Sequence, residues 1–84
     1  MAVRAPAAMG LLRGSEIAQE LGTLPSTIKH YRLLGLLSPV ATTPGGYHLF
    51  DVSAVRRARE IRRLQREERL TLQEIAGRLP VDDR

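Results

Sequence analysis

The spacing of Ala18, Gly22 and Ile28 is the feature that most restricts how this chain can fold. Two helices that cross closely need a small residue at the crossing, a residue that tolerates positive φ in the turn, and an apolar anchor on the second helix. The three residues meet these demands in that order. The spacing therefore predicts a helix-turn-helix, although an ordinary helical hairpin shares the first two demands.

Local signals predict where these two helices begin and end. Ser15 is expected to cap the first helix, and Gly22 is a good left-handed stop for it. Pro25 suits the first position of the second helix, in which apolar residues recur at helical spacing until Gly35. The sequence thus predicts two short helices joined by a tight turn.

The segment from 36 to 50 has the pattern of strands and turns. Gly45 and Gly46 exclude a helix, and the residues that follow them alternate as in the return strand of a hairpin. We expect a small β-hairpin wing. Tyr47 and Phe50 are predicted to pack this hairpin against the third helix.

Two further helices are expected after the wing. Asp51 is a strong N-cap for a third helix over 52–67. Thr71 with Glu74 three residues later makes a capping box for a short last helix over 72–79. The predicted fold is therefore mainly α, a winged helix-turn-helix with about four helices and a small β-hairpin wing.

Composition excludes most catalytic classes. The 84 residues fit one small domain, which leaves little room for a deep substrate cavity. The chain has no Cys and two His, and it contains no Ser-His-acid, HExxH or phosphate-loop arrangement. We therefore expect that the chain is not an enzyme and that it has neither a cofactor nor a metal site. No segment approaches the length of a membrane span, and we expect a cytoplasmic protein without a membrane partner.

The charge suggests a polyanionic partner. The net charge is +4, and twelve of the thirteen basic residues are Arg, whose planar fork matches phosphate. Six of the arginines fall within 56–66, and we interpret most of these six as the solvated face of a helix around an apolar stripe.

Four blocks of sequence, in order, are more specific than any single motif. EIAQELG, STIKHYRLLGLLSP, TPGGYHLFD and VRRAREIRRLQREERLTLQEI together resemble the DNA-binding domain of the MerR family of bacterial transcriptional regulators. The resemblance covers 12 to about 79, and it predicts a domain at 12–80. Residues 1–11 are expected to be a disordered arm, with a short extended piece at Leu11 and Leu12, and 81–84 a tail.

The resemblance implies sequence-specific binding of double-stranded DNA in transcription regulation, and therefore a nucleoid-associated protein. The helix at about 25–34 would enter the major groove, and the wing at 40–50 would contact the backbone. The predicted DNA-binding residues are Ser26, Thr27, Lys29, His30, Tyr31, Tyr47, His48, Arg13, Arg56 and Arg57, and the structural residues of the motif are Ala18, Gly22 and Ile28.

Several of these positions depart from the family pattern or have two interpretations. Lys29 and His48 stand where the family usually has Arg, so Lys29 keeps the cation but loses the bidentate fork. His30 has two interpretations: it contacts DNA, or its neutral ring packs over the face of the helix without a ligand. Tyr31 lies three residues after Ile28, so core packing is at least as well supported as DNA contact.

Partners and alternatives follow from the length. Relatives in the family continue into a dimerisation helix, so the chain is either a fragment of a longer regulator or a small standalone protein. A second copy of the chain or RNA polymerase is a further expected partner. The alternatives are an excisionase-like or architectural DNA-bending factor, and a protein-interaction module on the same fold.

Overall fold

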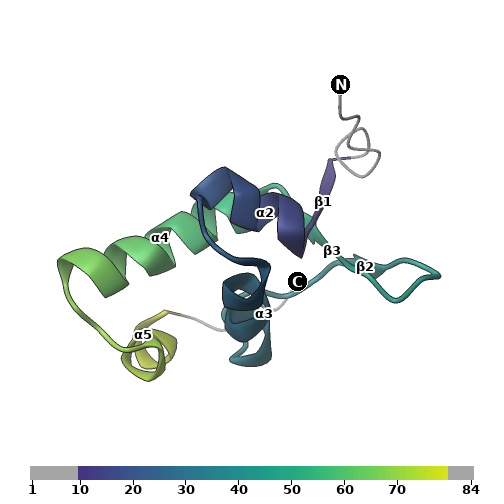
Figure 1. The fold of residues 1–84 in the computed structure, drawn as a ribbon. Helices are drawn as coiled ribbons and strands as arrows, with labels where there is room; N and C mark the ends of the chain where they lie inside the picture. The colour runs from purple at the N-terminus through teal and green to yellow at the C-terminus, as the bar shows by residue number, and fades with distance from the viewer. Residues whose placement is uncertain (1–9, 80–84) are drawn as a thin grey trace.

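The computed structural model describes residues 10–79, which form four helices and three short strands (Figure 1). Their order is β1 (Leu11–Arg13), α2 (Gly14–Leu21), α3 (Pro25–Leu33), β2 (Ala41–Thr42), β3 (His48–Asp51), α4 (Ser53–Glu67) and α5 (Leu72–Arg78). This arrangement confirms the mainly helical, winged helix-turn-helix fold. Most of the predicted arm and the whole predicted tail lie outside the described residues. The extended piece expected at Leu11 and Leu12 is present as β1.

The turn between α2 and α3 has the geometry that the spacing predicts. Gly22 has a φ of 68°, and the Thr23 amide donates to the Ala18 carbonyl oxygen at 2.9 Å, which ends α2 in a left-handed cap. Ala18 and Ile28 are each 1% exposed. The small residue and the apolar anchor therefore both belong to the core on which α2 and α3 pack, and Pro25 begins α3 as predicted.

The start of α2 differs from the prediction that Ser15 caps it. The N-cap is Arg13, because β1 pairs with β3 as far as Arg13 and the chain passes directly from the strand into the helix at Gly14. The Arg13 amide donates to Oε1 of Glu16 at 2.9 Å. The Glu16 carboxylate therefore closes the first turn, and Ser15 lies inside the helix.

The wing is part of a three-stranded antiparallel sheet in which β3 is central. Thr42 pairs with His48 across the predicted hairpin, and Leu12 pairs with Phe50 on the other side of β3. The Thr43 amide donates to the Tyr47 carbonyl oxygen at 2.8 Å, and Gly46 has a φ of 90°, which closes the turn. The hairpin is confirmed, and the pairing of β1 with β3 adds a strand to it.

The two wing aromatics have different environments, although the sequence predicts the same packing for both. Phe50 lies within β3 and is 2% exposed in the core. Tyr47 precedes β3, in the turn, and is 54% exposed. The prediction that Tyr47 packs the hairpin against the third helix is therefore wrong, because the ring lies outside the strand that faces the core.

The beginning of α5 follows the predicted capping pattern, whereas the N-cap of α4 is Val52 and not the predicted Asp51. α4 starts one residue later than predicted, and an Asp51 carboxylate oxygen accepts the Ser53 amide at 2.9 Å. At α5 the Glu74 amide donates to the Thr71 hydroxyl at 3.1 Å, and the Thr71 amide donates to the Glu74 carboxylate at 2.9 Å. This reciprocal pair is the predicted capping box.

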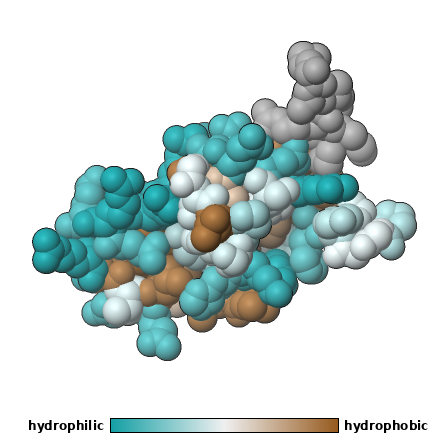
Figure 2. All heavy atoms as spheres, in the orientation of Figure 1, coloured by the Kyte–Doolittle hydropathy of each residue, from teal (hydrophilic) through white to brown (hydrophobic). Residues whose placement is uncertain are grey.

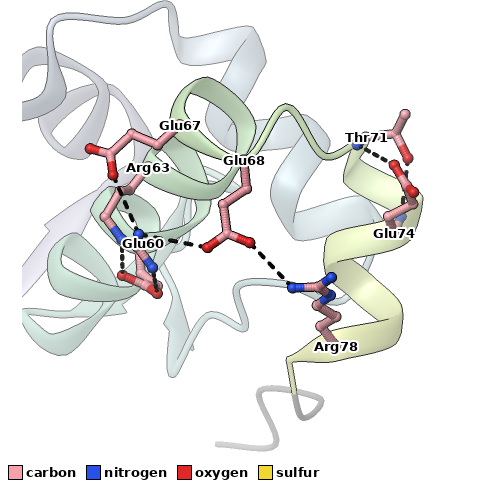
Figure 3. A network of polar contacts seen from close by, with 7 residues as sticks. All are labelled: Glu60, Arg63, Glu67, Glu68, Thr71, Glu74 and Arg78. Carbon is pink, nitrogen blue, oxygen red and sulfur yellow. Dashed lines mark hydrogen bonds and ion pairs between the residues drawn. The ribbon is translucent and has the colours of Figure 1, made fainter.

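An ion-pair network joins the end of α4 to α5 (Figure 3). Arg63 contacts Glu60 at 2.7 Å, Glu67 at 3.5 Å and Glu68 at 3.9 Å, and Glu68 also contacts Arg78 of α5 at 3.3 Å. These side chains are exposed, so each pair stabilises the fold only slightly. Ile75, which is fully buried, holds α5 against the core more strongly.

A single core lies where α2, α3, α4 and the sheet meet. Every element except β2 contributes to it, and no charged or polar residue among 10–79 is buried there. Its members are Leu12, Ile17, Ala18, Ile28, Tyr31, Leu36, Leu37, Phe50, Ala54, Ala58, Ile61, Leu64 and Ile75. The core fixes α3 and the wing relative to each other, and this placement builds the site described next. No helix within 10–79 has the length and apolar character needed to cross a membrane.

Candidate nucleic-acid interface

A groove of about 340 Å³ lies between α3, the start of α2 and the wing. Residues from three separate segments line it, namely Arg13, Gly14, Ser15, Pro25, Ser26, Ile28, Lys29, Arg32, Tyr47, His48 and Phe50. Strand β1 brings Arg13 to this place, because its pairing with β3 sets the start of α2 beside the wing. The sheet therefore joins parts of the chain that are far apart in sequence into one concave surface.

The groove is basic. Arg13, Lys29 and Arg32 line it, and none of its lining residues is Asp or Glu. Like charges gathered on one concave surface, with no carboxylate to balance them, produce a positive local potential that attracts anions. Arg13 and Lys29 are exposed, so their charged ends can reach a ligand outside the groove.

A cation–π contact positions Arg13 at the edge of this groove. The guanidinium carbon lies 4.1 Å from the centre of the Tyr47 ring. The Tyr47 amide donates to the Thr43 hydroxyl at 3.1 Å, which holds the turn that carries the ring. An exposed contact of this kind contributes about 0.5–1 kcal/mol, enough to favour one orientation of the arginine. Two predicted site residues from distant segments are thus brought together.

The exposed surface of α3 carries most of the residues predicted from the sequence. Ser26, Lys29 and His30 are exposed, and Thr27 is half-buried. Among these, Ser26 and Lys29 also line the groove, whereas His30 does not. α3 therefore presents short polar and cationic side chains next to the wing, a combination suited to hydrogen bonds with phosphates and base edges.

Tyr31 belongs to the core and lies outside the interface. Its side chain is fully buried, and its hydroxyl donates to Oε1 of Gln65 on α4 at 2.8 Å. Burial raises the pKa of the Tyr31 phenol above its usual value, an effect that the positive charge of Arg62 partly offsets. Of the two interpretations that the sequence allowed, the structure supports core packing.

The predicted residues on α4 and at the end of the wing lie differently. Arg57 is half-buried, and its Nε donates to the carbonyl oxygen of Leu36, so it connects α4 to the segment after α3. Arg56 is exposed, and neither arginine lines the groove. His48 lines the groove, and its Nδ1 is a buried atom without a hydrogen-bond partner. Arg13 therefore supplies a positive charge beside the wing, and Arg57 does not.

One cation of this surface was not predicted from the sequence. Arg32 lies one helical turn after Lys29 and lines the groove. The spacing of three residues between Lys29 and Arg32 was a usable signal, because residues so spaced share one side of a helix. Nothing in the sequence showed that this side faces the wing.

Comparison with known proteins gives a family. The model of the MerR HTH family regulatory proteins matches residues 12–81. No solved structure significantly matches the chain.

Three relatives carry the same name, HTH-type transcriptional regulator MerD. The protein from Pseudomonas fluorescens is 49% identical over 43 residues, which are 51% of this chain and 78% of that protein. The Pseudomonas aeruginosa protein is also 49% identical over 43 residues, and the Acinetobacter calcoaceticus protein is 46% identical over 48 residues. The matched segments cover 36% and 40% of these two proteins.

Proposed function

Because the chain belongs to the MerR family of helix-turn-helix regulatory proteins, as the sequence resemblance predicted, we propose that it binds double-stranded DNA sequence-specifically in transcription regulation. α3 enters the major groove, and the wing contacts the neighbouring backbone. The relatives' name, a transcriptional regulator rather than an enzyme, supports the same proposal.

The observation that carries this proposal is the basic groove between α3 and the wing. Arg13, Lys29 and Arg32 come from two segments and border one groove without a carboxylate. Ser26 and His30 are exposed on α3 beside Lys29, where they can contact base edges once phosphate contacts set the register. Tyr47 keeps Arg13 directed toward the backbone of the same duplex.

Salt dependence provides a quantitative test. A duplex is first selected from random sequences, and its affinity is then measured by fluorescence anisotropy between about 50 and 200 mM salt. Three cations that each neutralise one phosphate predict a slope of log K against log salt of about −3 per bound domain. Binding that is absent, or that does not change with salt, would overturn the proposal.

Lys29→Ala tests the position of the contact. The variant is expected to bind about fivefold more weakly and to reduce the salt slope by about one. Arg69→Ala removes the same charge from an exposed position outside the groove, so it is the matched control. Equal effects of the two variants would show that net charge, and not the α3 surface, produces the binding.

We also propose that two or more copies occupy one DNA site. Three cationic contacts give a single domain only modest affinity, and helix-turn-helix proteins commonly use paired half-sites. Sedimentation of the complex should show at least two chains per duplex. One chain on a high-affinity site would refute this, and a large bend in a circular-permutation assay would favour an architectural factor. Contact with RNA polymerase stays a prediction from the family resemblance.

A further inference from the structure

A second basic groove, of about 520 Å³, lies between the C-terminal end of α2 and α4. Its lining residues are Glu20, Leu21, Arg59, Arg62, Arg63, Arg66 and Glu67. It shares no residue with the groove between α3 and the wing, which is formed by the opposite end of α2. Figure 2 shows hydrophilic side chains over α2 and α4, in contrast to the apolar side chains gathered between α4 and α5.

The four arginines of α4 that line this groove divide into two groups. Arg63 is surrounded by three glutamates, which balance its charge (Figure 3). Arg59, Arg62 and Arg66 are spaced three and four residues apart, so they lie on one side of the helix. Within residues 10–79 none of these three forms a hydrogen bond or an ion pair. The groove therefore contains a row of three guanidinium groups that have no ion-pair partner among the described residues, beside the two carboxylates of Glu20 and Glu67.

The other lining residues favour a protein segment over a nucleic acid. Duplex DNA carries a charge for about every 1.7 Å of its axis, so its backbone would place phosphates against Glu20 and Glu67 as well as against the arginines. It would also cover the half-buried, apolar Leu21 with charge. A peptide can vary its side chains along its length. It can place carboxylates at the arginines, an apolar side chain on Leu21 and uncharged groups at the glutamates.

The length of the row fits a helix. From Arg59 to Arg66 the axis of α4 advances about 10 Å, at 1.5 Å per residue. A partner helix with acidic residues at the same spacing can face all three guanidinium groups, in the way that charged residues pair between neighbouring helices. We propose that this groove docks an acidic, amphipathic helical segment of another protein. The proposal is independent of DNA binding by α3.

The test uses the full chain and two synthetic helical peptides. One carries Glu at three positions spaced three and four residues apart, beside a Leu, and the other has Gln in place of each Glu. The acidic peptide should bind saturably below about 1 mM and shift the amide NMR signals of Glu20, Leu21 and residues 59–66. The Gln peptide should not bind.

A charge-reversal pair locates the contact. Arg66→Glu should weaken binding of the acidic peptide about threefold to tenfold, because it replaces an attraction by a repulsion. Arg69→Glu makes the same charge change at an exposed position outside the groove and should change affinity less than about twofold. Circular dichroism verifies that both variants fold. If one variant does not fold, the comparison of the acidic and Gln peptides on the unmodified chain still tests the proposal.

Five outcomes would overturn the proposal. Four concern the peptides: no saturable binding of the acidic peptide, equal weakening by the two variants, equal binding of the Gln peptide, and amide shifts confined to α3 and the wing. The fifth is a DNA contact at this groove. It would be shown if a selected duplex shifted the groove amides and Arg66→Glu lowered DNA affinity more than Arg69→Glu.

Discussion

Replacing Tyr31 by Phe removes a single hydroxyl group from the core and leaves the ring in place. In the structure that hydroxyl donates to Gln65 at 2.8 Å, and the bond joins α3 to α4. A hydrogen bond of this kind contributes about 1 kcal/mol net. For a domain of this size the loss corresponds to a decrease in Tm of about 4–8 °C. The aromatic ring keeps its packing, so the destabilisation should stay near that value.

Thermal denaturation followed by circular dichroism measures the effect, with Tyr47→Phe as the control. The Tyr47 ring is exposed, so the control should change stability by less than about 0.5 kcal/mol. The pH dependence gives a second readout. The folded-state pKa of Tyr31 is raised above the unfolded value of about 10, so its stabilisation is complete below pH 10 and is lost as the pH rises through the folded-state pKa. Tyr31→Phe should lack this component of the alkaline loss.

The affinity for a selected DNA duplex separates the two interpretations of Tyr31. With Tyr31 in the core, Tyr31→Phe binds DNA as the unmodified chain does at temperatures where both are folded. A variant with unchanged Tm but tenfold weaker DNA binding would refute the reasoning, because the hydroxyl would then act at the interface.

Four further predictions concern the cap of α5, the core and the wing. Thr71→Ala should cost about 1 kcal/mol in urea denaturation, since it removes the N-cap of α5. The pKa of Glu74 is held low by its hydrogen bonds with Thr71. The contribution of the ionised Glu74 to fold stability is therefore present above about pH 4.5 and is lost as the pH falls through the folded-state pKa. Glu74→Gln should flatten this acid dependence of stability, and an unchanged pH profile would contradict the prediction. Ala18→Leu should lower stability by about 1–3 kcal/mol through overpacking, and an unchanged urea midpoint would argue against a close helix crossing. A double-mutant cycle on DNA affinity with Arg13→Ala and Tyr47→Leu should give a coupling of about 0.5–1 kcal/mol, whereas additive effects would show that the ring does not position the arginine.

Features set by a few neighbouring residues were predictable. Gly22 ends α2, Pro25 begins α3, and the Thr71 capping box begins α5, because each depends on backbone geometry within one turn of chain. The Ser15 cap failed for a related reason. Its local signal was sound, but the pairing of β1 with β3 set the start of the helix two residues earlier.

The roles of individual side chains were harder to predict than the elements that carry them. Helical periodicity shows that Tyr31 and Ile28 share a side of α3, but it does not show that Gln65 accepts a hydrogen bond from the Tyr31 hydroxyl. The same holds for Arg57, whose partner is a backbone carbonyl from a segment 21 residues away in sequence. Contacts between distant segments decide these roles, and a local pattern carries no information about them.

The sequence alone determined the order of the elements, the crossing of α2 and α3 and the presence of a hairpin, because spacing, capping and turn chemistry act over short distances. Only the tertiary structure decided which cations act together. β1 adds to the wing and brings Arg13 to Tyr47, and Arg32 joins Lys29 in the groove. Of the four α4 arginines in the second groove, Arg63 pairs with glutamates, and the other three have no ion-pair partner among the described residues. Side chains combine into a surface only after long-range pairing and core packing fix the elements relative to one another, and that placement gives this chain its two basic grooves.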